Sequence, residues 1–202
     1  MELKMQVFTF LFLMLGPFKI IGPFAQITQN ADVALTRKIA INATLFASVA
    51  LLVAAFLGET ILSKYGIPLP ILALAAGIIL FLVALLNIIQ QFDAPAEHDV
   101  QAPPPTLKLA ISPLAFPTIV TPYGIAAVIV FMALSPDMES KWMVGAIIVG
   151  IMVLNLFIML ITRRLFKVLA LILPILGAVL GVVQVALGLL IMYNSIKSLI
   201  SS

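Results

Sequence analysis

The sequence has no cysteine among its 202 residues and only one histidine. Without cysteine there is no disulfide framework, no covalent haem attachment and no thiolate metal site. The histidine, His98, lies in a polar, proline-rich stretch and lacks the partners that a metal site or a catalytic triad needs. We therefore expect no metal and no cofactor.

Charged residues are also scarce, at 9% of the chain, while hydrophobic residues make up 63% and the mean hydropathy is +1.26. Roughly a quarter of a soluble domain is charged. The composition therefore predicts a polytopic membrane protein with the lipid bilayer as a partner. The net charge of +3 does not indicate nucleic acid, because no basic cluster resembles a binding arm. The sequence indicates no particular oligomeric state.

Six apolar stretches are long enough to cross a hydrocarbon core, which takes about 20 residues. They cover roughly residues 5–28, 39–57, 69–89, 107–134, 143–161 and 169–193. The first has no small-residue cleavage site, so we interpret it as a retained span and not as a signal peptide. A proline-rich polar linker at 91–106 separates residues 1–90 from residues 107–202. The predicted fold class is an all-α membrane protein with three spans in each half.

Basic residues set the expected orientation in the membrane. They are more numerous at the loops that follow the first, third and fifth spans, which places these loops in the cytoplasm and both termini outside. Because each half has an odd number of spans, any repeat between the halves must be inverted. Residues 76–80 resemble residues 187–191, which supports a repeat, although plain packing of small residues gives the same likeness.

Proline and glycine interrupt the first and fourth spans, at residues 15–26 (LGPFKIIGPFAQ) and 113–124 (PLAFPTIVTPYG). Proline removes a backbone donor and glycine lets the chain unwind. In a bilayer the freed backbone groups must be met by protein, water or ligand, so such backbone lines cavities. Matching interruptions in two halves are typical of a transporter core. The candidate binding residues are Gly16, Pro17, Lys19, Gly22, Pro23, Gln26, Pro117, Thr118, Thr121, Pro122 and Gly124.

Lys19 is the most informative of these candidates. A charged lysine in the middle of a span costs at least about 2.5–3.5 kcal/mol, and no acidic residue lies within a span to neutralise it. One interpretation is that its ammonium faces a central cavity, where it meets a substrate carboxylate or holds the place of a coupling cation. The other is that Lys19 lies near an interface and snorkels. We assign Asn42, Asn155 and Gln184 to helix packing.

An enzyme is not expected from this sequence. Hydrolysis within the membrane needs a nucleophile with a base, a carboxylate pair or a metal cluster. The spans contain no histidine, cysteine or carboxylate, apart from Glu59 just at the extreme edge of the second span. Ser48 or Ser112 with Lys19 would make a serine–lysine pair, but no spacing in the sequence supports it.

Residues 113–122 (PLAFPTIVTP) resemble the P-L-A-I-P-L-x-A-G-P element of the MarC family of integral membrane proteins, with the three prolines in register. Residues 77–86 are similar to the family's G-G-I-I-L-F-L-I-A run, and the first interruption resembles its N/D-P-x-G-x-x-P-x-F signature. The resemblance covers essentially the whole chain. It implies two inverted three-helix repeats with a site between the broken first and fourth spans. It also implies SnatA-type transport of small neutral amino acids, such as glycine and alanine, across the inner membrane of a prokaryote.

The chain departs from the family pattern at the first interruption. Gly16 stands where the family has Asn or Asp, the two prolines are six residues apart instead of five, and Lys19 occupies the region of the family's glycine. If the family's polar residue handles a coupling cation, this chain has lost it. We hypothesise that Lys19 replaces the charge of that cation, so that coupling to H+ or Na+ is absent or altered.

A channel or a non-transporting membrane scaffold is the alternative function. A channel is expected to carry rings of polar residues along a continuous pore, and the spans of this chain are too apolar to supply them. A scaffold would use the two interruptions as packing kinks and would bind no solute.

Overall fold

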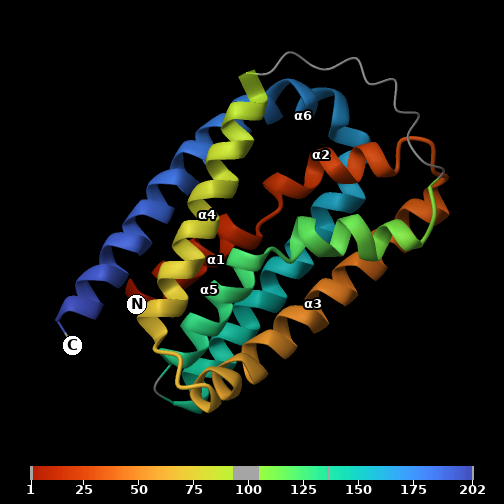
Figure 1. Ribbon diagram of the computed structural model, residues 1–202. Helices are drawn as coiled ribbons and strands as arrows, with labels where there is room; N and C mark the ends of the chain where they lie inside the picture. The colour runs from red at the N-terminus through yellow and green to blue at the C-terminus, as the bar shows by residue number, and fades with distance from the viewer. Residues whose placement is uncertain (1, 93–104, 136, 202) are drawn as a thin grey trace.

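The computed structural model describes residues 2–92, 105–135 and 137–201, and every regular element in these residues is a helix (Figure 1). The elements in chain order are α1 (Glu2–Leu15), α2 (Phe18–Ile27), α3 (Val33–Lys64), α4 (Leu69–Phe92), η1 (Ala110–Ile119), α5 (Pro122–Ala133) and α6 (Met138–Ile200). The prediction of an all-α protein is confirmed for these residues. Most of the predicted linker at 91–106, with His98, lies outside the described residues.

Five helical segments in the described residues are long and apolar enough to cross a membrane. They are Val7–Ile27, Val33–Leu62, Leu69–Ile89, Met138–Thr162 and Gly177–Ile200. The bent pair Ala110–Ile119 and Pro122–Ala133, with 59° between its two parts, makes a sixth if it counts as one span. The chain is therefore a multi-pass integral membrane protein. These segments overlap the six predicted apolar stretches, although the last one, Gly177–Ile200, begins and ends later than the predicted 169–193.

Two helices run further than the apolar stretches they contain. At its start α3 is capped by Asp32, whose carboxylate accepts a hydrogen bond from the Leu35 amide at 2.6 Å. It ends at Lys64, just before Gly66 with its positive φ of 62°. The backbone of α6 stays helical through both of the last two predicted spans and turns back at the top of Figure 1. Charged residues mark where a chain leaves lipid, and they do not by themselves end a helix.

The helices pack through small residues and turn large ones outward. On α3 the residues that are fully buried recur every three or four positions, and most of them are alanine. Beside Ile39 at the start of this face, they are Ala40, Ala43, Ala47, Leu51 and Ala55, whereas Ile41, Leu45, Val49 and Val53 are exposed. This pattern is typical of membrane helices, because small residues let backbones approach closely while lipid covers the large ones.

The segment formed by α1 and α2 lies at the centre of the molecule. Half of the apolar window in Val7–Ile27 is buried, against 17% for Gly177–Ile200. Leu11, Leu15 and Phe24 are completely buried, and the two short helices contact α5, α6 and η1. In Figure 1 they cross the middle of the bundle, with α4 and the last part of α6 on one side and α3 on the other. The gap between α1 and α2 is therefore an interior feature.

Candidate functional site

The first helix break lies at Gly16 and Pro17, between the end of α1 and the start of α2. A Cβ atom on Gly16 would collide with the backbone carbonyl oxygen of Phe12, so only glycine fits there. Pro17 precedes α2 without a side-chain cap and has no N–H to give to the carbonyl of Leu13, four residues earlier. The sequence thus ends α1 inside the protein, with carbonyl groups that need other partners.

Three consecutive carbonyl groups at the end of α1 receive hydrogen bonds from side chains. The Gln184 amide donates to the carbonyl of Leu13 at 3.2 Å, and the Asn155 amide donates to the carbonyl of Leu15 at 2.8 Å. Between them, the Lys19 ammonium donates to the carbonyl of Met14. Both amides come from α6, more than 100 residues away in sequence, so tertiary structure and not local capping satisfies this break.

Lys19 also contacts the second half of the chain. Its Nζ atom lies 3.5 Å from the carbonyl oxygen of Ile119, at the end of η1, and 5.4 Å from the centre of the Tyr123 ring on α5. The side chain is half-buried and forms no ion pair within the described residues. Carbonyl dipoles and an aromatic face therefore compensate its positive charge, and no carboxylate takes part.

The second helix break lies at Val120 and Thr121, between η1 and α5. Its hydrogen bonds are local: the Thr121 hydroxyl accepts from the Gly124 amide at 3.1 Å, and the Val120 amide donates to Ala115 at 2.8 Å. Pro122 opens α5, where its missing N–H costs nothing. Two non-helical residues, Ser112 and Phe116, make η1 irregular.

The two breaks meet, and we call residues 14–19 together with 119–124 the junction. Lys19 links them through the carbonyls of Met14 and Ile119. A Cβ atom on Gly124 would lie 2.7 Å from Cδ2 of Leu15, so the start of α5 packs directly on the end of α1. The junction therefore places two helix starts and two helix ends, with their opposite partial charges, around one ammonium group.

The structure brings some of the predicted site residues together and leaves others apart. Gly16, Pro17, Thr121 and Gly124 are buried at the junction beside the half-buried Lys19. Further along α2, Gly22 and Pro23 are half-buried. The side chains that do not point into the interior are Gln26, Pro117 and Pro122, which are exposed, and Thr118, whose hydroxyl donates to Pro113 of its own segment at 3.0 Å.

Sequence analysis did not single out Tyr123. It assigned Asn155 and Gln184 to helix packing, and both amides do hydrogen-bond the neighbouring helix α1. Asn155 is only 1% exposed, and while its nitrogen bonds Leu15, its oxygen Oδ1 is buried without a hydrogen-bond partner. A buried amide oxygen without a hydrogen-bond donor is unusual in a folded protein. In the sequence, Asn155 could have been noticed as a single amide side chain within an apolar span.

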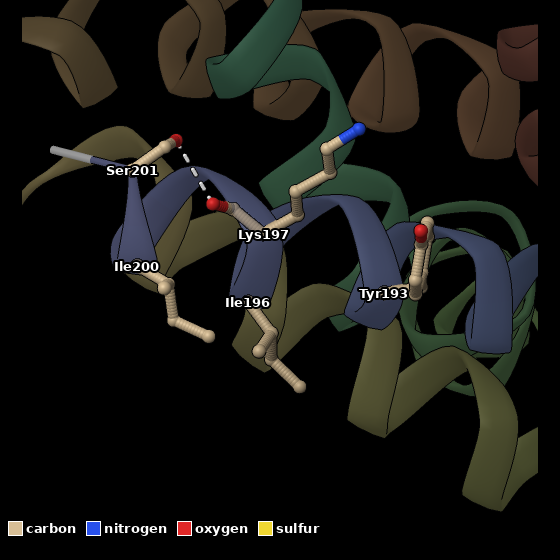
Figure 2. Close-up of a pocket in the computed structure, with 5 residues that line it drawn as sticks. All are labelled: Tyr193, Ile196, Lys197, Ile200 and Ser201. Atoms are coloured by element: carbon tan, nitrogen blue, oxygen red, sulfur yellow. Dashed lines mark hydrogen bonds between the residues drawn. The ribbon is translucent and has the colours of Figure 1, made fainter.

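A groove of about 340 Å³ lies elsewhere, at the end of α6 (Figure 2). It is lined by Tyr193, Ile196, Lys197, Ile200 and Ser201, and the Ser201 hydroxyl donates to the Lys197 carbonyl at 2.9 Å. The tyrosine and the lysine are exposed near a helix end, as is typical of a membrane interface. None of its residues belongs to the junction. The described residues also contain no group of three metal-ligating side chains.

The helices and the buried junction define a multi-pass integral membrane protein with discontinuous interior helices. Residues 1–200 match the family model described as MarC family integral membrane protein, and the chain belongs to this family. The family predicted from the proline motifs is thereby confirmed.

Two relatives carry membrane-protein names. The chain is 28% identical over 192 residues to the UPF0056 membrane protein MJ1677 of Methanocaldococcus jannaschii, which covers 94% of each chain. It is 27% identical over 123 residues to the UPF0056 membrane protein YhcE of Escherichia coli strain K12, which covers 60% of this chain and 57% of the relative. No solved structure matches the chain.

Proposed function

We propose that this protein is a secondary transporter, of the SnatA type, that moves small neutral amino acids such as glycine and alanine by alternating access. The observation that carries the proposal is the Lys19 ammonium, held in the interior between the ends of two interrupted helices. A charge within a membrane protein that no carboxylate neutralises marks a solute or ion pathway by default. Discontinuous helices are where transporters bind their substrates.

The junction offers complementary groups to a zwitterion. A substrate carboxylate suits the Lys19 ammonium and the starts of α2 and α5, where helix dipoles are positive. A substrate ammonium suits the unpartnered Oδ1 of Asn155. The close packing at Gly16 and Gly124 leaves little room, which favours a small side chain on the substrate.

Alternating access would rest on two inverted three-helix repeats. Gly77 on α4 and Gly188 on α6 support this idea, because a Cβ atom on either would lie 3.0 Å from the carbonyl oxygen of the other. Such reciprocal contacts are expected where equivalent elements meet across a two-fold axis. Six spans would place both termini on one side of the cytoplasmic membrane of a prokaryote, and the basic loops make that side the outside, with binding between α1–α2 and η1–α5.

Counterflow tests this function. Proteoliposomes with purified protein are preloaded with unlabelled alanine or glycine, and the uptake of labelled amino acid is followed. A carrier accumulates label transiently above equilibrium, and competition among small neutral amino acids should saturate it. A channel equilibrates label without overshoot, and a scaffold leaves it outside, so either result would contradict the proposal. Liposomes without protein give the background.

A further inference from the structure

The end of α1 has the ligands of a small cation site. The carbonyls of Leu13, Met14 and Leu15 lie at the negative end of a helix, and the carbonyl of Ile119 reaches the same place from η1. Unwound carbonyls and helix ends of this kind coordinate monovalent cations in transporters and channels. No carboxylate takes part among the described residues, which argues against Ca²⁺ or Mg²⁺.

Lys19 supplies the cation from within the chain. Its ammonium is a compact charge with three donors, and it is directed to the Met14 and Ile119 carbonyls with the Tyr123 ring beside it. The neighbouring carbonyls of Leu13 and Leu15 are met instead by neutral amides. The one position that lacks an amide donor is thus the one that holds the charge.

Asn155 provides a second, independent observation. Its side chain is buried, its Nδ2 bonds the Leu15 carbonyl next to Met14, and its Oδ1 on the same amide has no partner. This buried oxygen is therefore a further acceptor beside the end of α1 that has no donor.

We propose that Lys19 occupies a monovalent-cation site formed by the carbonyls of Met14 and Ile119 and the Tyr123 ring, and that removing its ammonium opens the site to Na+, K+ or a small primary ammonium ion. The inference deepens the proposed function, because it rests on the same junction. It predicts that the wild-type chain needs no soluble cation there. Lys19 is then a positioning residue that holds the two breaks together.

Thermal unfolding of purified protein in detergent tests this site without any substrate. The variants are Lys19→Met, which keeps a long apolar stem, Lys19→Ala, which leaves more room, and Lys64→Met as the control, since Lys64 is exposed at the end of α3. Each is measured at equal concentrations of sodium, potassium, methylammonium, tetramethylammonium and choline chloride. Tetramethylammonium carries the same charge as methylammonium but has no N–H donor.

We expect at least one Lys19 variant to melt about 3 °C higher in sodium, potassium or methylammonium than in choline or tetramethylammonium. Wild type and Lys64→Met should melt at the same temperature in all five salts. Identical melting of both Lys19 variants in every salt, or their failure to fold in any of them, would overturn the proposal. A sodium-dependent wild type would also overturn it. Because unfolding is read without transport, failed counterflow would leave this result standing.

Discussion

The two helix breaks differ in how their backbone groups find hydrogen-bond partners. At the second break, Thr121 caps α5 and Val120 bonds Ala115, so the backbone is satisfied by residues of the same segment. At the first break, the carbonyls at the end of α1 are met by Asn155 and Gln184 from α6 and by the ammonium of Lys19. The second break is capped mainly within its own segment, with Lys19 reaching the Ile119 carbonyl from outside, whereas the first depends on side chains from a distant helix.

This difference predicts which of the two breaks responds when the helices of the bundle move. A break that is capped locally keeps its shape when neighbouring helices move, because its hydrogen bonds move with it. A break that is capped from another helix changes when that helix shifts, which couples its carbonyls to the arrangement of the bundle. The first break is therefore expected to sense the movement of α6, while the second provides a fixed surface for Lys19 to contact.

The largest loss of stability at the two breaks should come from substituting the two junction glycines. Gly16→Ala should cost about 3 kcal/mol of unfolding free energy, because its Cβ meets the Phe12 backbone, which cannot turn aside. Gly124→Ala should cost less, about 1–2 kcal/mol, because its Cβ meets the side chains of Leu15 and Thr121 and no backbone atom. Equilibrium unfolding in mixed micelles measures both.

Gly150→Ala is the matched control for these substitutions. Nothing lies within 4 Å of a Cβ atom at this position in α6, so the change should stabilise the helix by about 0.5–1 kcal/mol. If Gly16→Ala were as stable as Gly150→Ala, the close contact between residue 16 and the Phe12 carbonyl would be contradicted.

Removing the distant caps should have the next largest effect. Asn155→Leu should cost about 1–2 kcal/mol, because it leaves the buried Leu15 carbonyl without a donor. Gln184→Leu should cost less than about 1 kcal/mol, since its bond is longer and only partly buried. The same unfolding assay applies, and the reverse order would contradict the account of the first break.

The local cap should matter somewhat less. Thr121→Val removes the acceptor for the Gly124 amide and should cost about 1 kcal/mol, whereas Thr121→Ser keeps the hydroxyl and should cost little. Amide hydrogen exchange along α5 should show the loss confined to its first turn. Faster exchange at the end of α1 as well would show that the second break is not capped mainly within its own segment.

The smallest effect is expected at Gln26. Its side chain is exposed at the end of α2, so Gln26→Ala should change the unfolding free energy by less than about 0.5 kcal/mol. Counterflow by this variant should equal that of wild type if the solute binds at the junction. A marked loss of counterflow with unchanged stability would move the site along α2.

The fold was largely predictable from the sequence, because lipid allows few structures other than apolar helices. The family was also predictable, from prolines that keep their spacing in residues 113–122. The continuous backbone of α6 was not, since the charged residues between its two apolar stretches resembled a loop.

The candidate site was predictable in part. Proline, glycine and a lone lysine are unusual enough in an apolar segment to stand out from the sequence. The roles of Asn155 and Gln184 were not predictable, because their partners are backbone carbonyls 140 and 171 residues away. The carbonyls that need a side-chain donor are set by where α1 ends in the folded protein. The identity of the side chains does not reveal that position.

The central claim is that Lys19 takes the place of a soluble cation at the first break. The most direct test is alanine counterflow by wild type, Lys19→Met and Lys64→Met, with sodium or choline on both sides of the membrane. The account predicts equal rates in both salts for wild type and Lys64→Met, and a rate for Lys19→Met that is restored by sodium. A wild type that stops in choline, or a Lys19→Met variant equal to wild type in both salts, would contradict it.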